Sequence, residues 1–184
     1  MQVNYKQAQD ILNKSQILYT AKELSQKTKA IANAIEAEIN GEIPLFLTVM
    51  NGGMFFASEI MKYIKKPFIA DYIHASRYGD TTFGSGHISW YRQPKAEDVK
   101  GKIIYVLDDI LDEGHTLAEV VRVLTHLGAK QCKLAVLINK DLGKSKPIAA
   151  DFIGYTAPNK YLFGCGMDIY GVYRQLSDIY IYNE

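Results

Sequence analysis

Uninterrupted apolar runs alternate with helical patterns along this chain, and this alternation limits the folds open to it. The apolar runs are residues 44–50 (PLFLTVM), 102–109 (KIIYVLDD) and 132–139 (CKLAVLIN). Runs without regular polar alternation are typical of strands buried on both faces of a sheet. Helical patterns follow the first two runs at 54–64 and 115–128, and residues 68–75 form a further candidate strand. We therefore predict an α/β fold with a doubly wound parallel sheet, capped by a small hood built from the chain ends.

The length of 184 residues suits one domain spanning 1–184, with enough chain to bury a substantial core. Two segments differ from the rest of the chain in amino-acid composition. Residues of about 76–90 are polar and glycine-bearing, which indicates a flexible loop with a hairpin. Residues of about 141–184 are rich in Gly, Pro and Tyr, and we predict that they form a C-terminal cap on the sheet.

Charge and composition exclude several classes of partner. Basic and acidic residues number 21 and 20, a net charge of +1, so no broad basic field favours nucleic acid. No apolar run approaches the ~18 residues of a membrane span, and the first residues lack the layout of a signal peptide. We expect no membrane partner and a cytoplasmic location. Cys132 and Cys165 are too few for a disulfide framework or a cysteine metal site.

The turn after the central run is crowded with acids. Asp108, Asp109, Asp112 and Glu113 lie within six positions of each other, immediately before the helix at 115–128. Their mutual repulsion means that the fold alone does not favour them, whereas ligands bind beyond the carboxyl ends of parallel strands. One alternative is that Asp112 and Glu113 only favour the helix dipole. That alternative leaves the adjacent pair, Asp108 and Asp109, unexplained.

Two halves of this turn favour opposite chemistries. The backbone amides of 112–116 lie at a helix N-terminus, which suits an anion, and Thr116 adds a hydroxyl. Gly114 allows close approach of a ligand and an unusual backbone conformation. Asp108 and Asp109 instead suit Mg²⁺ or sugar hydroxyls. Phosphorylated ribose with a metal ion would satisfy both halves.

Several motifs together resemble a known family. The stretch VLDDILDEGHTL (106–117) resembles the phosphoribosyl pyrophosphate signature of the type I phosphoribosyltransferases, most closely that of the hypoxanthine-guanine phosphoribosyltransferases. MNGGMFF is similar to the family's pyrophosphate loop, and ASRYGDTT to the start of its flexible catalytic loop. NKD, KYLFGCGMD and YRQL follow the family's C-terminal order. The resemblance covers about residue 44 to the end and implies a type I phosphoribosyltransferase-like fold.

The resemblance implies an activity. The family joins a 6-oxopurine (hypoxanthine or guanine) to 5-phosphoribosyl pyrophosphate with Mg²⁺, giving IMP or GMP and pyrophosphate in purine salvage. By resemblance Asp112 is the general base at purine N7, and Asp108 and Asp109 meet the ribose hydroxyls and the metal. The resemblance also assigns the 5′-phosphate to residues 112–116, which are Asp112, Glu113, Gly114, His115 and Thr116.

The resemblance assigns roles to further residues, which on their own would be read as core, loop or surface residues. Lys140 would donate to purine O6, Tyr161 would stack on the base, and the backbone of Leu162 would meet the ring edge. The remaining assignments are Asn51, Gly52 and Arg174 to pyrophosphate, Asp168 to a second metal site, and Ser76, Arg77, Tyr78 and Gly79 to a mobile loop that excludes water from the closed site.

Three departures from the family pattern bear on phosphate affinity. Asn51 stands where lysine is common, Glu113 where threonine is usual, and Arg77 is inserted before Tyr78-Gly79. Two alternatives stay open: a xanthine-preferring relative, and a non-catalytic regulator that senses purine or phosphoribosyl pyrophosphate on the same fold. A regulator is expected to lose the base and carry a basic face, whereas Asp112 is present here. Relatives are commonly dimers or tetramers, so we expect a homo-oligomer.

Overall fold

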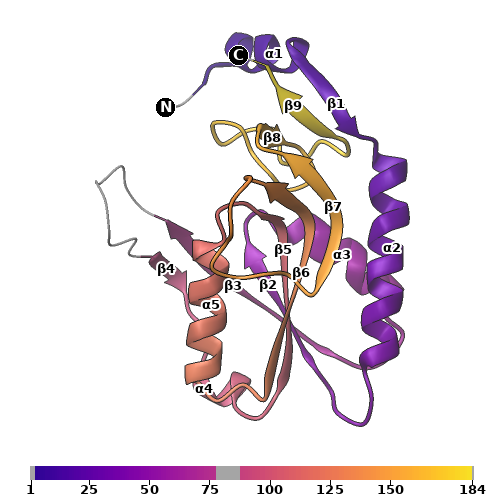
Figure 1. Cartoon of the computed structure of the whole chain (residues 1–184), viewed down its shortest axis with the longest axis vertical. Helices are drawn as coiled ribbons and strands as arrows, with labels where there is room; N and C mark the ends of the chain where they lie inside the picture. The colour runs from indigo at the N-terminus through magenta and orange to yellow at the C-terminus, as the bar shows by residue number, and fades with distance from the viewer. Residues whose placement is uncertain (1–2, 78–87, 184) are drawn as a thin grey trace.

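The structure is a computed structural model that describes residues 3–77 and 88–183 (Figure 1). The helices are α1 (Tyr5–Asn13), α2 (Ala21–Glu38), α3 (Met54–Tyr63), α4 (Ala96–Val99) and α5 (His115–His126). The strands are β1 (Ser15–Tyr19), β2 (Leu45–Met50), β3 (Ile69–Arg77), β4 (Ile88–Arg92), β5 (Ile103–Leu111), β6 (Gln131–Asp141), β7 (Phe152–Pro158), β8 (Tyr161–Phe163) and β9 (Ile179–Tyr182). No helix in the described part of the chain is long and apolar enough to cross a membrane.

Six strands form the main sheet, in the order β4-β3-β2-β5-β6-β7. Every neighbouring pair is parallel except β3 and β4, which form the antiparallel hairpin expected near the polar loop. Helices α2 and α3 cover one face and α5 covers the other (Figure 1). The predicted doubly wound α/β fold is confirmed.

Burial on both faces explains the uninterrupted apolar runs. Successive residues of β2 alternate between two cores: Phe46 packs with α2 and α3, while Leu45 and Leu47 pack with α5. All three are essentially inaccessible to solvent. Because side chains of a strand point to opposite faces in turn, a strand covered on both sides has no regular series of solvent-facing positions.

A second, three-stranded sheet in the order β1-β9-β8 forms the cap, and it joins the two ends of the chain (Figure 1). The N-terminus of α2 is tied to this cap. Thr20 and Glu23 form a capping box, and the Asp178 carboxylate accepts a hydrogen bond of 2.6 Å from the Ala21 amide. The hood predicted from the chain ends is therefore present.

The boundary of the cap differs from the expectation. Residues of about 141–184 were expected to form the cap, but β7 lies in the main sheet, parallel to β6. Its glycine and proline make it look unlike a buried strand in the sequence. Gly154 has a structural reason, since a Cβ at this position would lie 2.3 Å from the Leu137 carbonyl oxygen. The close approach of two strands requires the glycine that hides the strand from sequence analysis.

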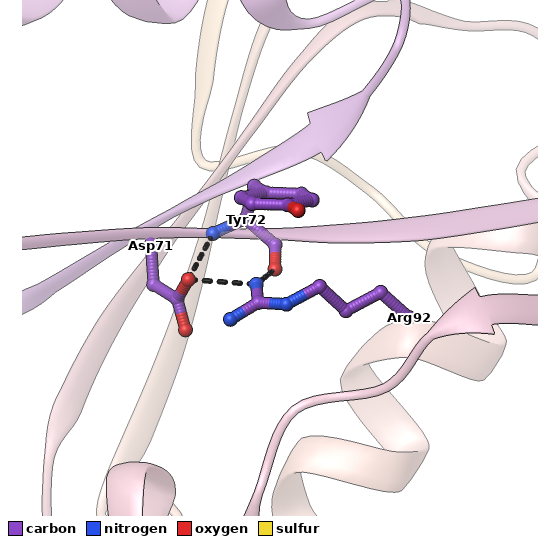
Figure 2. Close-up of polar contacts among 3 residues, drawn as sticks. All are labelled: Asp71, Tyr72 and Arg92. Carbon is purple, nitrogen blue, oxygen red and sulfur yellow. Dashed lines mark hydrogen bonds and ion pairs between the residues drawn. The ribbon is translucent and has the colours of Figure 1, made fainter.

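The β3–β4 hairpin is held at its outer edge by a polar clasp (Figure 2). Arg92 Nη1 donates to Asp71 Oδ1 at 2.7 Å and also to the Tyr72 carbonyl oxygen. The Tyr72 amide donates to the same Asp71 oxygen at 2.8 Å, and the guanidinium carbon lies 4.1 Å from the centre of the Tyr72 ring. The clasp anchors the edge strand β4 to β3.

Candidate active site

A cleft of about 550 Å³ opens where β2, β5 and β6 end, beneath the cap. It is lined by the turn after β2, the turn after β5, the end of β6 and loops of the cap. The predicted site residues that line it are Asn51, Gly52, Asp108, Asp109, Asp112, Glu113, Gly114, His115, Thr116, Lys140, Tyr161, Leu162, Asp168 and Arg174. The fold thus gathers in one place residues that lie more than 120 positions apart in the sequence.

The predicted mobile-loop residues are the exception. Tyr78 and Gly79 lie outside the described residues, and of Ser76 and Arg77 the structure describes only the backbone, at the end of β3. Their assigned role stays a prediction.

Asp108 and Asp109 form a buried acidic pair at the end of β5, with 9% and 5% of their surface exposed. Burial, together with the charge of the neighbouring Asp109, raises the pKa of Asp108 well above its ordinary value. Burial likewise raises the pKa of Asp109 to about 6. Two adjacent buried carboxylates are costly when ionised, and a cation or hydroxyl donors in the cleft would relieve that cost.

The turn after β5 leads into a helix start that favours an anion. Gly114 is the N-cap of α5 with φ +85°, and it has no side chain to accept hydrogen bonds from the first-turn amides. These amides therefore face the cleft with the positive end of the helix dipole. The Glu113 side chain is exposed, and Arg122 donates two hydrogen bonds of 2.6 Å to Glu119.

The turn after β2 packs directly against the acidic pair. The Met50–Asn51 peptide is cis. A Cβ at Gly52 would lie 2.3 Å from Asp109 Oδ2, so only glycine lets this loop approach the carboxylate. A Cβ at Gly53 would lie 2.6 Å from the Leu107 carbonyl oxygen. The double glycine therefore places Gly52 beside Asp109, and Asn51 lines the cleft next to it.

Asp112 and Lys140 lie next to each other on the wall of the cleft. Lys140 Nζ donates to Asp112 Oδ2 at 2.6 Å, and the two residues come from the ends of the neighbouring strands β5 and β6. The Lys140 side chain is 11% exposed, whereas the Asp112 side chain is 47% exposed. One carboxylate acceptor and one ammonium donor thus lie side by side, as a planar ligand with adjacent polar groups would require.

The cap supplies the opposite wall. Arg174 pairs with Asp168 and donates from Nη1 to the Gly166 carbonyl oxygen at 2.7 Å. Asp168 Oδ2 also accepts the Gly171 amide at 2.8 Å. Tyr161 is half exposed at the rim, and Leu162 beside it is buried. In this arrangement the Asp168 carboxylate is neutralised by Arg174.

No cluster of three or more His, Cys, Asp or Glu side chains that could hold a metal by itself occurs within residues 3–77 and 88–183. The buried Asp108–Asp109 pair nevertheless fits a hard divalent cation. Mg²⁺ in proteins is commonly held by one or two carboxylates together with substrate oxygens and water.

His74 also lines the cleft, although no sequence motif pointed to it. It lies on β3 directly beside Met50 in the parallel register. Its imidazole packs against Tyr91 with ring centres 4.6 Å apart. The available signal was its place at the carboxyl end of a predicted strand, next to the turn that carries Asn51.

Comparison with known proteins agrees with this geometry. The phosphoribosyl transferase domain family matches residues 14–169. A hypoxanthine-guanine phosphoribosyltransferase of Lactococcus lactis subsp. lactis is 31% identical over 160 residues, which cover 87% of this chain and 86% of that protein. The bifunctional protein TilS/HprT of Listeria innocua is also 31% identical over 87% of this chain, but the chain spans only 24% of its length.

Solved structures show the same architecture. The crystal structure of a hypoxanthine-guanine phosphoribosyltransferase from Bacillus anthracis is 26% identical, with a TM-score of 0.79. The match covers 91% of this chain and 97% of that one.

Proposed function

Because the chain belongs to the phosphoribosyl transferase domain family, we propose that it transfers the 5-phosphoribosyl group of phosphoribosyl pyrophosphate to a 6-oxopurine. The acceptor is hypoxanthine, guanine or both, and the products are IMP or GMP and pyrophosphate, in purine salvage. The observation that carries the proposal is the Asp112–Lys140 pair, a carboxylate and an ammonium 2.6 Å apart beside an anion-binding helix start.

The pair matches the polar edge of a 6-oxopurine. Lys140 donates to O6, and Asp112 accepts the proton that N7 loses as the glycosidic bond forms at N9. An ammonium group has donors only, so the 6-amino group of adenine would set donor against donor. Tyr161 stacks on the base, and the backbone of Leu162 meets the ring edge.

The sugar phosphate fits the turn after β5. The amides of Glu113, Gly114, His115 and Thr116, with the Thr116 hydroxyl, bind the 5′-phosphate at the start of α5. Asp108 and Asp109 accept hydrogen bonds from the ribose hydroxyls, which fits two carboxylates held at the floor of the cleft.

The leaving group fits the opposite side of the cleft. Asn51 and Gly52 present backbone groups to pyrophosphate, and Arg174 supplies a positive charge. Asp108 and Asp109 would hold Mg²⁺ together with substrate oxygens, and Asp168 would contribute to a second metal site. Bound Mg²⁺ would supply further positive charge to the leaving pyrophosphate. The side chains around C1′ hold base and sugar in line, so that C1′ passes from pyrophosphate to N9 without water.

A direct assay tests the proposal. The purified chain is incubated with Mg²⁺, phosphoribosyl pyrophosphate and one of hypoxanthine, guanine, xanthine or adenine, and nucleotide products are separated. We expect nucleotide from hypoxanthine or guanine. The kcat/KM for adenine should be lower by about 10³-fold or more, because the adenine 6-amino group and the Lys140 ammonium group would be buried as two facing donors without an acceptor. Relatives of Bacillus subtilis and Lactococcus lactis are named hypoxanthine-guanine phosphoribosyltransferases, which favours hypoxanthine or guanine over the two alternatives, a xanthine-preferring enzyme and a non-catalytic regulator. Nucleotide formed from xanthine alone would indicate a xanthine-preferring enzyme, and no nucleotide from any base would indicate a non-catalytic regulator.

We also propose that the chain acts in the cytoplasm as a homo-oligomer, a dimer or tetramer, without nucleic acid or membrane partners. Exposed aromatic side chains along the β3–β4 edge, Tyr72 and Tyr91, support a subunit contact there. Light scattering of the purified protein measures the oligomeric state, and a monomer at micromolar concentration would contradict the proposal.

A further inference from the structure

Lys146, in the segment between β6 and β7, lies behind the cleft and has no role in the chemistry described above. Its Nζ donates to the Leu111 carbonyl oxygen at 2.7 Å and to Asn139 Oδ1 at 2.8 Å. Both bonds are partly buried. Burial lowers the pKa of Lys146, and the nearby Asp112 carboxylate opposes this effect.

The two acceptors occupy matching positions in the sheet. Leu111 is the last residue of β5 and immediately precedes Asp112, while Asn139 immediately precedes Lys140. Leu111 and Asn139 are also partners in the parallel register of β5 and β6. A single ammonium group therefore bridges the two strand ends one residue before the pair that faces the cleft.

This arrangement differs from that of an ordinary loop lysine. Partial burial of an ammonium group costs free energy unless its donors are satisfied, and here two of them meet strong acceptors. Lys144, only two residues earlier, is exposed. The contrast shows that the segment directs one particular lysine toward the strand ends.

We propose that Lys146 is a positioning residue that fixes the ends of β5 and β6, and thereby the relative placement of Asp112 and Lys140 at the purine. The proposal rests on the proposed function. It predicts an effect confined to the purine side of the reaction, because the phosphate-binding start of α5 and the turn after β2 lie outside the two hydrogen bonds.

The test compares Lys146→Met, which keeps the chain length and removes the donors, with Lys144→Met as matched control. In Lys146→Met we expect kcat/KM for hypoxanthine to fall by about tenfold or more, since small misplacement of catalytic groups is costly. The KM for phosphoribosyl pyrophosphate should change by less than about threefold, and the preference for hypoxanthine over adenine should narrow. Lys144→Met should match the wild type in all three.

A double-mutant cycle separates positioning from general damage. Asn139→Leu removes one acceptor and should show the same purine-side loss, and the double variant should be little worse than Lys146→Met because both remove one clamp. If Lys146→Met does not fold, Asn139→Leu alone carries the comparison. The proposal would be overturned if Lys146→Met had the same kinetic constants as Lys144→Met. It would also be overturned if the losses of kcat/KM in Lys146→Met and Asn139→Leu were additive in the double variant, or if Lys146→Met impaired the use of hypoxanthine and of phosphoribosyl pyrophosphate equally. An inactive wild type would instead contradict the proposed function itself.

Discussion

At the scale of single residues, Asp112 differs from the two carboxylates of β5 that precede it in the sequence. It is half exposed and paired with Lys140, whereas Asp108 and Asp109 are buried. Asp112→Asn keeps the size of the side chain and removes proton acceptance. We expect kcat to fall by roughly 10²-fold or more, with little change in the KM for phosphoribosyl pyrophosphate. Steady-state kinetics test this, with Asp141→Asn, at the exposed residue next to Lys140, as control. If Asp112→Asn keeps most of the wild-type kcat, Asp112 is not the general base.

Glu113 raises a different question, because it places a negative charge next to the proposed phosphate site. Its side chain is exposed, and the phosphate contacts we propose come from backbone amides and the Thr116 hydroxyl. Glu113→Gln should therefore change the affinity for phosphoribosyl pyrophosphate by less than about fivefold, or ~1 kcal/mol. Thr116→Val should weaken it more, because a contact is lost outright. Calorimetric titration of both variants with phosphoribosyl pyrophosphate measures these affinities. A hundredfold higher affinity in Glu113→Gln would mean that the Glu113 carboxylate faces the phosphate.

At the scale of elements, the Asp71–Arg92 clasp determines how firmly β4 is held to the sheet. Burial raises the pKa of Asp71, but hydrogen bonds from Arg92 and the Tyr72 amide outweigh it and lower the pKa overall. The carboxylate is therefore charged at neutral pH and available to the guanidinium, which also stacks on Tyr72.

Breaking the clasp should loosen β4 more than it affects the rest of the molecule. In Asp71→Asn we expect faster amide hydrogen exchange in Ile88–Arg92 and a Tm lower by about 2–4 °C. Glu97→Gln is the matched control, because the Lys95–Glu97 pair is long at 3.7 Å and both side chains are largely exposed. Exchange in β4 that is equal in the two variants would show that the clasp does not anchor the strand.

At the scale of the whole molecule, the buried acidic pair couples stability to pH. The pKa of Asp109 is about 6 in the folded chain and near 3.9 in an unfolded one, so the folded state binds more protons between these values. Its contribution is fully present below about pH 4 and is lost as the pH rises through about 6. The ionised Asp109 should therefore lower the free energy of unfolding of the ligand-free protein at neutral pH.

Asp109→Asn removes this titration, so the variant should gain stability relative to the wild type as the pH rises. Urea unfolding at pH 4 and pH 7.5 should show the difference in unfolding free energy shifting in favour of the variant by about 1–3 kcal/mol. Asp141→Asn serves as the exposed control and should show no such shift. A difference for Asp109→Asn that is the same at both pH values would contradict the linkage.

Much of the fold and of the site follows from interactions within a few residues, and these could be predicted from the sequence. The Thr20–Glu23 capping box joins residues three positions apart, and both of its hydrogen bonds are present. The helix start after Gly114 was predicted from the glycine and the apolar pattern behind it, and φ +85° explains why glycine is there. The place of the acidic turn in the cleft followed from the rule that ligands bind beyond the carboxyl ends of parallel strands.

Tertiary structure alone decided the contacts between segments that are distant in sequence. The membership of β7 in the main sheet depends on its approach to β6, which a glycine permits and no local periodicity reveals. The hydrogen bonds of Lys146 to Leu111 and Asn139 span 35 and 7 positions, and only the register of β5 with β6 brings both acceptors to one ammonium group. The sequence shows which side chains can form hydrogen bonds. The packing of whole helices and strands determines which partner a polar group has, because a buried donor can bond only to the acceptors that packing brings within hydrogen-bond distance.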